Sequence, residues 1–553
     1  MKMRSLLRVA VAGTATVGLI VVAATAASSS TGPTATFSLA GVAKGPSTTT
    51  NPYVLPVAAG VSTTSLLTVN DAGAAGNGFE LVGIPDGIGS RWDHGKIVAF
   101  VNHELRNNVG IPRRHGVKGA FVSKLTIDPI TKRVIKGEDL INPGVQYWNY
   151  ATGTYSASPS PAWAIDGVTA PAQLAEFARF CSGSLTTPFQ LISWTSLRGY
   201  PGQIYFANEE NGDESRAFGV TTDGNAYQLP RLGLFSWENT IAAPTRGDTT
   251  LVLGNEDSAV GQLWAYVGTK QYKGSPVDRA GLTNGKNHVL DIVDQAVTND
   301  VQFRAAYGTG TPAAVTFKEV DWTLGGAAQN ALAAGNGLSL NRIEDGSFDP
   351  RNRNDYYFVT TEGGKGATVS NDPAFPTVGN GRDGGGLWRL HFADVDKPVL
   401  GGTLELLLDG SESIGLNKPD NMTIDDRGNL LIQEDPGGNV HIARIVAYRI
   451  ADGAIGTVAQ FDPAVFGRDA ALANSPSFLT FDEESSGIIP TTYQFGPGTF
   501  LFDAQIHTAK GLPAGTGPGT VEEYVENGQL LLLKVNSWTA VYGSPAPPGS
   551  DDD

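Results

Sequence analysis

The sequence has little of the chemistry used by disulfide-rich or zinc-binding proteins. Its 553 residues include one cysteine, Cys181, and seven histidines. One cysteine excludes an intramolecular disulfide framework, and so few histidines argue against a histidine-rich zinc centre. The net charge of -16 argues against a nucleic-acid partner, because a phosphate backbone recruits basic surfaces. The same charge is compatible with binding cations. The sequence also has no nucleotide-binding loop, no Gly-x-Ser-x-Gly elbow and no Cys-x-x-Cys pair.

Long apolar runs are missing except at the N-terminus. A basic head with Lys2, Arg4 and Arg8 precedes an apolar stretch from about residue 9 to residue 24, and small residues follow. This order predicts a secretory signal peptide over residues 1–27, with a retained membrane anchor as the alternative. The predicted protein is therefore secreted, without stable membrane insertion after cleavage. We expect a flexible segment at 28–51, one folded domain at 52–542 and a disordered acidic tail at 543–553.

The folded part repeats one kind of unit, a short apolar strand that ends in polar or acidic residues before a Gly, Asn or Asp turn. Examples begin at residues 97, 251, 356 and 422. Many short strands in recurring hairpins predict an all-β protein, a β-propeller of about six blades with loop and short helical insertions. Two packed β-sandwiches are the alternative. A propeller gathers equivalent strand ends around one opening, so acids at those ends would converge there.

The stretch around Cys181 has the strongest chemical character. An apolar run at residues 204–207 leads into Glu209 and Glu210, so that a soft ligand and hard ligands lie on neighbouring pieces of chain. A thiolate with carboxylates suits iron, and calcium could take the remaining oxygens. The alternative is that Cys181 is a small buried apolar residue and the acids form a solvated loop.

Further polar groups follow predicted strands elsewhere. Arg342 and Glu344 share one face of an extended segment, where Arg342 could hold a phosphate oxygen and Glu344 a metal; a surface ion pair is the alternative. The remaining candidates are Asn102, Glu104, Glu238, Glu256, Asp257, Asp420 and Asn421. Taken alone, each of these is as compatible with a strand end or a turn cap as with a ligand.

In this order, the motifs resemble the PhoX alkaline phosphatases from about Asn102 to Asp503. The motifs that carry the resemblance are Asn102-His103-Glu104, Cys181 with Glu209-Glu210, Glu238 after an aromatic residue, Glu256-Asp257, Arg342 with Glu344, and Pro419-Asp420-Asn421. The resemblance implies a propeller whose opening holds two Fe3+ ions bridged by the Cys181 thiolate, with Ca2+ nearby. It also implies secretion and hydrolysis of phosphate monoesters.

Carried over position by position, the resemblance gives each candidate a role. Arg342 and Glu344 are the expected catalytic residues, and Arg342, Asn102 and Asn421 the expected substrate-binding residues. The expected metal ligands are Cys181, Glu209, Glu210, Glu238, Glu344, Glu104, Glu256, Asp257 and Asp420. The expected partner is a small phosphate ester and the expected state a monomer. Two alternatives stay open: a non-catalytic calcium-binding propeller that binds a wall polymer or a protein, and a phytase-like or lactonase-like calcium-dependent hydrolase.

Overall fold

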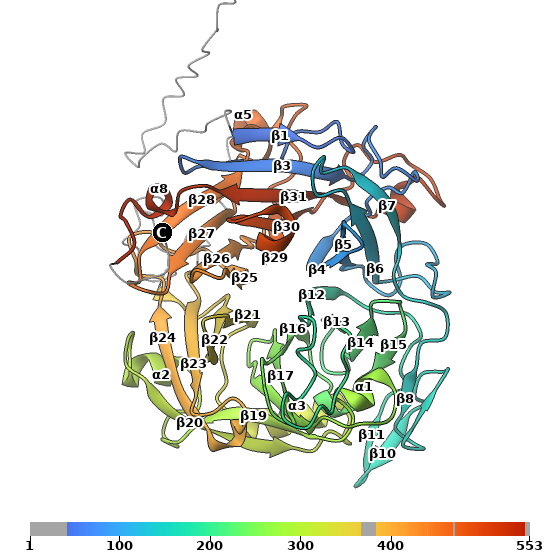
Figure 1. The fold of residues 1–553 in the computed structure, drawn as a ribbon, viewed down its shortest axis with the longest axis vertical. Helices are drawn as coiled ribbons and strands as arrows, with labels where there is room; N and C mark the ends of the chain where they lie inside the picture. The colour runs from blue at the N-terminus through green and yellow to red at the C-terminus, as the bar shows by residue number, and fades with distance from the viewer. Residues whose placement is uncertain (1–40, 366–382, 440, 468–469, 548–553) are drawn as a thin grey trace, which may run out of the picture.

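In the computed structural model the strands form a ring of sheets around a central opening (Figure 1). The structure describes residues 41–365, 383–439, 441–467 and 470–547. The predicted signal peptide and most of the predicted acidic tail lie outside these residues. Within the described residues the main strands group into six units, each with four antiparallel strands, and further strands pair at the outer edges. The innermost strands of these units contact one another in a closed ring. The predicted propeller is therefore confirmed, and the alternative of two packed β-sandwiches is wrong.

Each unit is given from its innermost strand outwards. The first unit contains β4 (Pro85–Asp93), β5 (Lys96–His103), β6 (Phe121–Ile127) and β7 (Val134–Asp139), and the second contains β12 (Phe180–Leu185), β13 (Ile204–Glu209), β14 (Ala217–Thr221) and β15 (Ala226–Gln228). The third unit contains β16 (Trp237–Ala242), β17 (Thr249–Glu256), β18 (Leu263–Thr269) and β19 (Lys286–Ile292). The fourth unit contains β21 (Ile343–Asp349), β22 (Asn352–Thr360), β23 (Gly386–Phe392) and β24 (Gly402–Leu408). The fifth unit contains β25 (Pro419–Ile424), β26 (Asn429–Glu434), β27 (Arg444–Arg449) and β28 (Ile455–Phe461). Strand β20 (Ala313–Val320) pairs with β19 and β24, so it joins the third and fourth units at their outer edges.

The sixth unit closes the ring with both ends of the chain. It contains β29 (Glu483–Pro490), β30 (Thr499–Ile506) and β31 (Asn527–Val535), followed outwards by β3 (Val61–Thr68) and β1 (Val42–Lys44). Strand β2 (Val54–Pro56) pairs with β28 at the edge of the fifth unit. The N-terminal strands thus tie two units to each other. Strand β1 lies inside the range 28–51 that the sequence analysis assigned to a flexible segment.

The remaining elements are short hairpins, helices and 3-10 turns outside the six units. Two hairpins follow the first unit: β8 (Tyr147–Asn149) with β9 (Thr154–Ser156), and β10 (Trp163–Ile165) with β11 (Val168–Ala170). The helices are α1 (Pro276–Arg279), α2 (Asp300–Ala306), α3 (Gly326–Asn336), α4 (Pro463–Phe466), α5 (Ala470–Ala473), α6 (Thr492–Phe495), α7 (Val521–Tyr524) and α8 (Trp538–Tyr542), with 3-10 turns η2 (Pro230–Leu232) and η4 (Pro398–Leu400). In the part of the chain that the structure describes, none of the helices is long and apolar enough to cross a bilayer.

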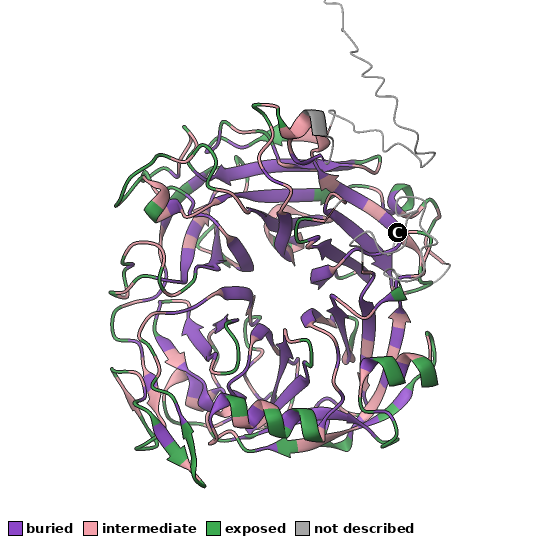
Figure 2. Ribbon diagram, turned by 180° about the vertical axis from the view of Figure 1, so that it is seen from behind, coloured by how far each residue is buried: buried purple, intermediate pink, exposed green. Residues whose placement is uncertain are grey.

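Each unit is buried on both faces because its neighbours pack against it. Alternate residues of a strand point to opposite faces, and β5 shows the result. Ile97 and Ala99 pack toward the sixth unit, whereas Val98 and Phe100 pack toward the second. One hydrophobic cluster of this kind lies between each pair of neighbouring units. Viewed from behind, the strands are accordingly mostly buried, and exposed residues lie mainly in outer loops and helices (Figure 2).

Side chains on the second strand of each unit hold the innermost strand of the next unit. Asn102 of β5 donates from Nδ2 to the carbonyl oxygen of Cys181 at 2.6 Å. Gln505 of β30 donates to Asp86 Oδ2 at 3.0 Å, which joins the last unit to the first. The other contacts of this kind are Asn208 to Thr240, Asn255 to Glu344, Thr361, just after β22, to Pro419, and Gln433 to Ser486. These hydrogen bonds fix the positions of the innermost strands around the opening.

Candidate metal centre

Six polar side chains occupy the same position in the six units. In each unit the first residue of the innermost strand pairs with the last residue of the second strand, as Pro85 does with His103. The next residue of the innermost strand is Asp86, Cys181, Glu238, Glu344, Asp420 or Glu484, in chain order. All six are buried. The fold therefore brings five carboxyl groups and the thiol of the chain to one end of the ring.

An irregular register accompanies this position. The innermost strand gains one residue relative to its partner near the start of β4, β12, β16, β21 and β25, and slightly later in β29. Such β-bulges re-aim a side chain and end regular pairing, and they are frequent next to active sites. A bulge repeated in every unit is a structural reason for the convergence of these side chains.

A second set of side chains follows the second strand of each unit. Glu104 comes after β5, Glu210 after β13 and Asp257 after β17. Asp435 comes after β26 and His507 after β30, whereas the fourth unit has a threonine. Each of these residues comes directly after the residue that pairs with the first residue of the innermost strand. The two sets therefore lie at the same end of the ring.

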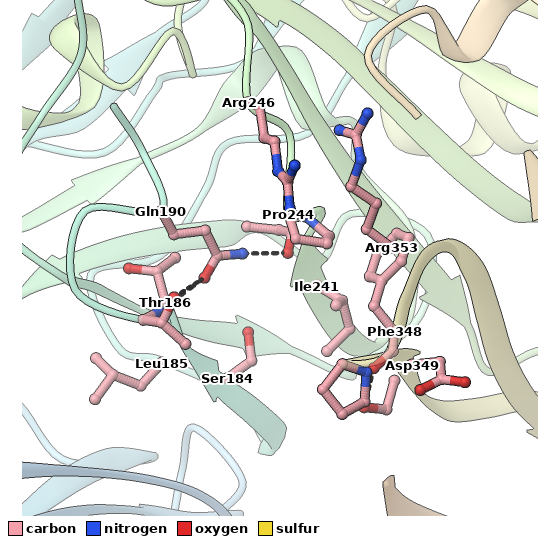
Figure 3. A pocket seen from close by; sticks show the side chains of 14 residues that line it. Ser184, Leu185, Thr186, Gln190, Ile241, Pro244, Arg246, Phe348, Asp349 and Arg353 are labelled. Atoms are coloured by element: carbon pink, nitrogen blue, oxygen red, sulfur yellow. Dashed lines mark hydrogen bonds between the residues drawn. The ribbon is translucent and has the colours of Figure 1, made fainter. Parts of the chain in front are cut away.

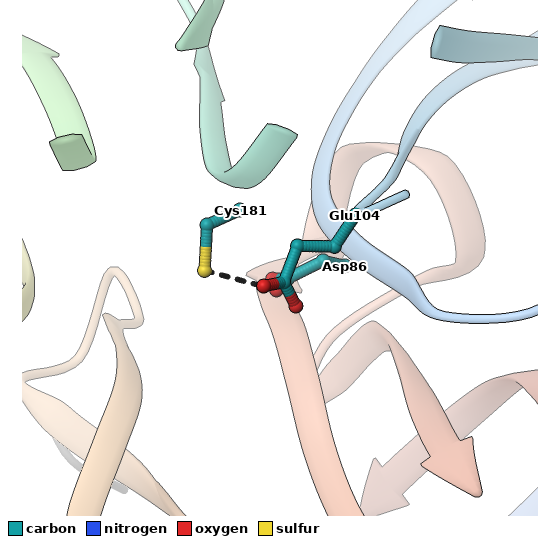
Figure 4. Close-up of side chains that lie close together, drawn as sticks. All are labelled: Asp86, Glu104 and Cys181. Atoms are coloured by element: carbon teal, nitrogen blue, oxygen red, sulfur yellow. Dashed lines mark hydrogen bonds between the residues drawn. The ribbon is translucent and has the colours of Figure 1, made fainter. Parts of the chain in front are cut away.

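Seven of these side chains form three groups whose ligand atoms lie within 4.8 Å of one another. The groups are Asp86, Glu104 and Cys181; Cys181, Glu210 and Glu238; and Glu238, Glu344 and Asp420. The Cys181 Sγ atom is 3.2 Å from Asp86 Oδ2 and 3.0 Å from Glu238 Oε2. Figure 4 shows the sulfur and the carboxyl groups of Asp86 and Glu104 turned toward one another. Cys181 and Glu238 each belong to two groups, so the three groups are continuous.

The buried acids shift one another's ionisation. Burial, and then the neighbouring carboxylates, raise the pKa of Asp86, Glu238 and Asp420 well above the usual value. The pKa values of Glu210 and Glu344 are raised mainly by burial, although Arg179 and Arg342 oppose the shift. Burial and the nearby acids also raise the pKa of the Cys181 thiol. Ionised ligands would thus need added positive charge at this position.

Three basic residues come directly before innermost strands. Arg179 precedes β12, Arg342 precedes β21 and Lys418 precedes β25, with φ angles of 47°, 56° and 49°. This left-handed backbone is unusual for residues other than glycine, and such strain clusters at functional sites. Arg179 pairs with Glu104 and, at 2.5 Å, with Glu210. Arg342 pairs with both oxygens of Asp257, at 2.8 and 2.9 Å, and lies 3.4 Å from Glu344.

Three predicted ligands, Glu209, Glu256 and Asp257, lie outside the three groups. Arg216 holds Glu209 through two side-chain contacts of 2.7 and 2.6 Å and one backbone N–H. Glu256 accepts from the Trp264 indole at 2.8 Å, and burial raises its pKa to about 7. Glu209 and Glu256 are the last residues of their strands, so they face the next strand of their own unit. Glu210 and Asp257 come one residue later.

The two predicted substrate-binding amides are buried in contacts within the protein. Asn102 accepts from the Tyr205 hydroxyl at 2.9 Å besides donating to Cys181, so its amide links two units and does not face the opening as the substrate-binding prediction requires. Asn421 accepts from the backbone of Gly487 at 2.5 Å and donates to Asp420 Oδ1 at 2.6 Å, with Glu238 Oε1 at 3.5 Å. Asn421 therefore positions two of the clustered carboxyl groups.

Sequence reasoning missed Asp86, Glu484, Arg179 and Lys418 as site residues. A signal for Asp86 exists, because Pro85-Asp86 repeats the Pro419-Asp420 pair at the start of an equivalent strand. Glu484 likewise follows the first residue of its strand. Asp503, which ends the family resemblance, is fully buried in β30, and neither of its oxygens has a hydrogen-bond partner among the described residues.

The residues present fit a multinuclear cation site. Asp86 Oδ1 is buried without a hydrogen-bond partner in the part of the chain described, and it belongs to a group that includes Cys181. Carboxylate oxygens suit hard cations and a thiolate suits softer ones, and both kinds of donor are present here. Two guanidinium groups face a larger number of carboxyl groups, which leaves negative charge for cations to balance.

The fold and the site together define a class: a β-propeller with a buried, acid-rich centre that contains one thiol. Residues 220–485 match the model of the family "Alkaline phosphatase PhoX". The structure is similar to Pseudomonas fluorescens PhoX in complex with vanadate, a transition state analogue, with 13% identity and a TM-score of 0.57, over 86% of this chain and 95% of that one. These findings show that residues 220–485 are similar to the PhoX family and that the chain shares the fold of a PhoX structure.

Two further solved structures are similar at lower scores. A putative gluconolactonase matches with 8% identity and a TM-score of 0.30, over 86% of this chain and 93% of that one. The GH43_1 enzyme from Xanthomonas citri complexed with xylose matches with 9% identity and a TM-score of 0.30, over 85% and 93%. Neither supports an inference about this chain. No curated protein sequence matches it.

Proposed function

We propose that the protein is a secreted, metal-dependent phosphatase that hydrolyses phosphate monoesters at the centre of the propeller. The observation that carries this proposal is the meeting of seven buried ligand side chains, including the thiol, in three continuous groups. They come from five of the six units of a PhoX-type fold. A surface ion pair or a solvated acidic loop would not bury so many carboxyl groups together.

The donor atoms support two kinds of cation. Cys181 belongs both to the group with Asp86 and Glu104 and to the group with Glu210 and Glu238, which is the placement that a thiolate bridging two Fe3+ ions requires. The third group contains carboxylates alone and suits Ca2+. When bound, such cations supply the positive charge and Lewis acidity that phosphoryl transfer needs.

The protein's own residues would hold and orient the ester. Asp257 fixes the Arg342 guanidinium through two contacts, so the side chain loses little freedom when it binds a phosphate oxygen. Lys418 lies at the equivalent position of the next unit and adds a second positive charge. The substrate is an anion and the chain is acidic, so these side chains and the cations together must offset the repulsion. Glu344 belongs to the third group and lies 3.4 Å from the Arg342 guanidinium, so it connects the two.

Hydrolysis of p-nitrophenyl phosphate by the purified protein, combined with iron and calcium analysis, tests this function. We expect iron and calcium in the active protein, and loss of activity with a chelator, in Cys181→Ser and in Glu210→Gln. Glu319→Gln is a matched control, because Glu319 is half-exposed and its ion pair is with the exposed Lys286. Full activity in Cys181→Ser would refute the bridging role of the thiolate.

The same measurements separate the alternatives. Calcium without iron and no hydrolysis of any ester would indicate a non-catalytic calcium-binding propeller. Preference for phytate, or hydrolysis of lactones, would indicate the calcium-dependent hydrolases instead. Secretion is part of the proposal, and it predicts a mature N-terminus close to residue 28 in the exported protein.

A further inference from the structure

A pocket of about 360 Å³ lies at the other end of the innermost strands. Its walls include Ser184 and Leu185 at the end of β12, Ile241 at the end of β16 and Phe348 at the end of β21. Figure 3 shows these side chains around the cavity, with Arg246 and Arg353 above them. Ser184 is three residues beyond Cys181, roughly 10 Å along an extended strand. The pocket is therefore separate from the metal centre although both use the same three strands.

Apolar groups and one fixed amide form most of this pocket. Leu185, Ile241, Pro244, Phe348 and Pro350 supply an apolar lining. The amide group of Gln190 accepts from the backbone of Thr187 at 2.7 Å and donates to the carbonyl oxygen of Ala242 at 2.6 Å. Its side chain is thus held in place in the wall. A pocket of this size with an apolar lining and a few fixed polar groups is typical of small-molecule sites.

The charges of the lining leave one cation without a partner. Asp396 pairs with Arg353 at 2.5 Å and accepts the backbone N–H groups of Arg246 and Gly247 at 2.7 and 3.0 Å. Asp349 pairs with Arg351. The exposed Arg246 guanidinium has no ion pair or hydrogen bond with any described residue. The pocket therefore has one unpaired positive charge in a protein of net charge -16.

We propose that this pocket binds a small organic anion, a carboxylate, phosphate or sulfonate attached to an apolar body. Arg246 would bind the anionic group, and the apolar lining would cover the body. A bare inorganic anion would leave this lining in contact with water, so the apolar part should contribute much of the affinity. The Trp194 backbone donates to the carbonyl oxygen of Arg246 at 3.0 Å, and the Trp194 side chain is 64% exposed.

Fluorescence titration of the metal-loaded protein with 8-anilino-1-naphthalenesulfonate tests the proposal. We expect Arg246→Gln to weaken binding about 10-fold, because a hydrogen bond to a charged group contributes about 1.5 kcal/mol or more. The control Arg133→Gln, at an exposed position in another unit, should leave the affinity unchanged. Ile241→Trp should fill the pocket and abolish binding, and the neutral analogue 1-anilinonaphthalene should bind much more weakly.

Three results would overturn the proposal. The first is equal affinity of Arg246→Gln and the unmodified protein, and the second is equal affinity for the neutral analogue. The third is binding that persists in Ile241→Trp but is lost in Trp194→Ala, which would place the probe on the exposed indole. If Ile241→Trp does not fold, the affinity of Arg246→Gln for the probe still tests the proposal, because replacing the exposed Arg246 does not disturb the core.

Discussion

Two adjacent glutamates provide the sharpest test of the site, because the structure gives them opposite roles. Glu209 ends β13 and pairs with Arg216, and the two side chains are only 5% and 4% exposed. Glu210 follows it and belongs to the second ligand group. The perturbation is the same for both residues: Glu209→Gln and Glu210→Gln each remove one charge and keep the shape of the side chain.

The expected free energies of unfolding differ in the chelated protein. Glu209→Gln leaves the buried Arg216 without its ionised partner, and breaking a buried pair in this way costs about 3–5 kcal/mol. Glu210→Gln removes a charge that burial disfavours, and Arg179 keeps its contact with Glu104. We therefore expect Glu210→Gln to change the stability of the chelated protein by about 1 kcal/mol or less.

The metal-loaded protein should show the reverse order in function. Glu210→Gln should lose bound iron and phosphatase activity, whereas Glu209→Gln should retain both wherever it is folded. Urea denaturation in chelator, metal analysis and p-nitrophenyl phosphate hydrolysis measure these effects on the same samples. The reasoning is refuted if Glu210→Gln destabilises the chelated protein as much as Glu209→Gln does, or if Glu209→Gln is the variant that loses metal.

Three further predictions follow from other contacts. Burial raises the pKa of Asp345 and Asp435 to about 7. Their protonation therefore stabilises the chelated fold at acid pH. The free energy of unfolding should fall by about 1.4 kcal/mol per group and pH unit between the unfolded pKa and pH 7. Denaturation at pH 5 and pH 8 measures this fall, and constant stability would contradict the prediction. Arg342→Lys should lower kcat/KM about 10- to 100-fold with iron content unchanged, because lysine cannot keep both contacts with Asp257; an unchanged kcat/KM would exclude Arg342 from phosphate binding. Asn102→Ala should cost about 1–3 kcal/mol in urea denaturation with KM unchanged; a raised KM with unchanged stability would instead support the predicted role of Asn102 in substrate binding.

Several features were predictable from local sequence. Recurring apolar strands that end in acids predicted the propeller, because a unit with two apolar faces must pack between neighbours. The same pattern placed Glu104 and Glu210 at strand ends, and both lie in the three ligand groups. Their roles as ligands stay predictions until metal analysis is done.

Other features depend on register, which the strand pattern leaves open. Glu209 and Glu210 are equally acidic in the sequence, and only the pairing of β13 with β14 turns one toward Arg216 and the other toward Cys181. Asn102 precedes an acid at a strand end, but its amide holds the neighbouring unit because that unit's innermost strand lies within reach.

The sequence by itself determined the kind of fold, through the spacing and apolarity of its strands, and the supply of one thiol and many acids near strand ends. The tertiary structure alone decided which side chains meet, including Asp86, which is 95 residues away from Cys181 in the chain but only 3.2 Å from its sulfur. The physical reason is that closing the ring sets one bulged position of each innermost strand against the same opening. Chain distance then no longer limits which charges interact.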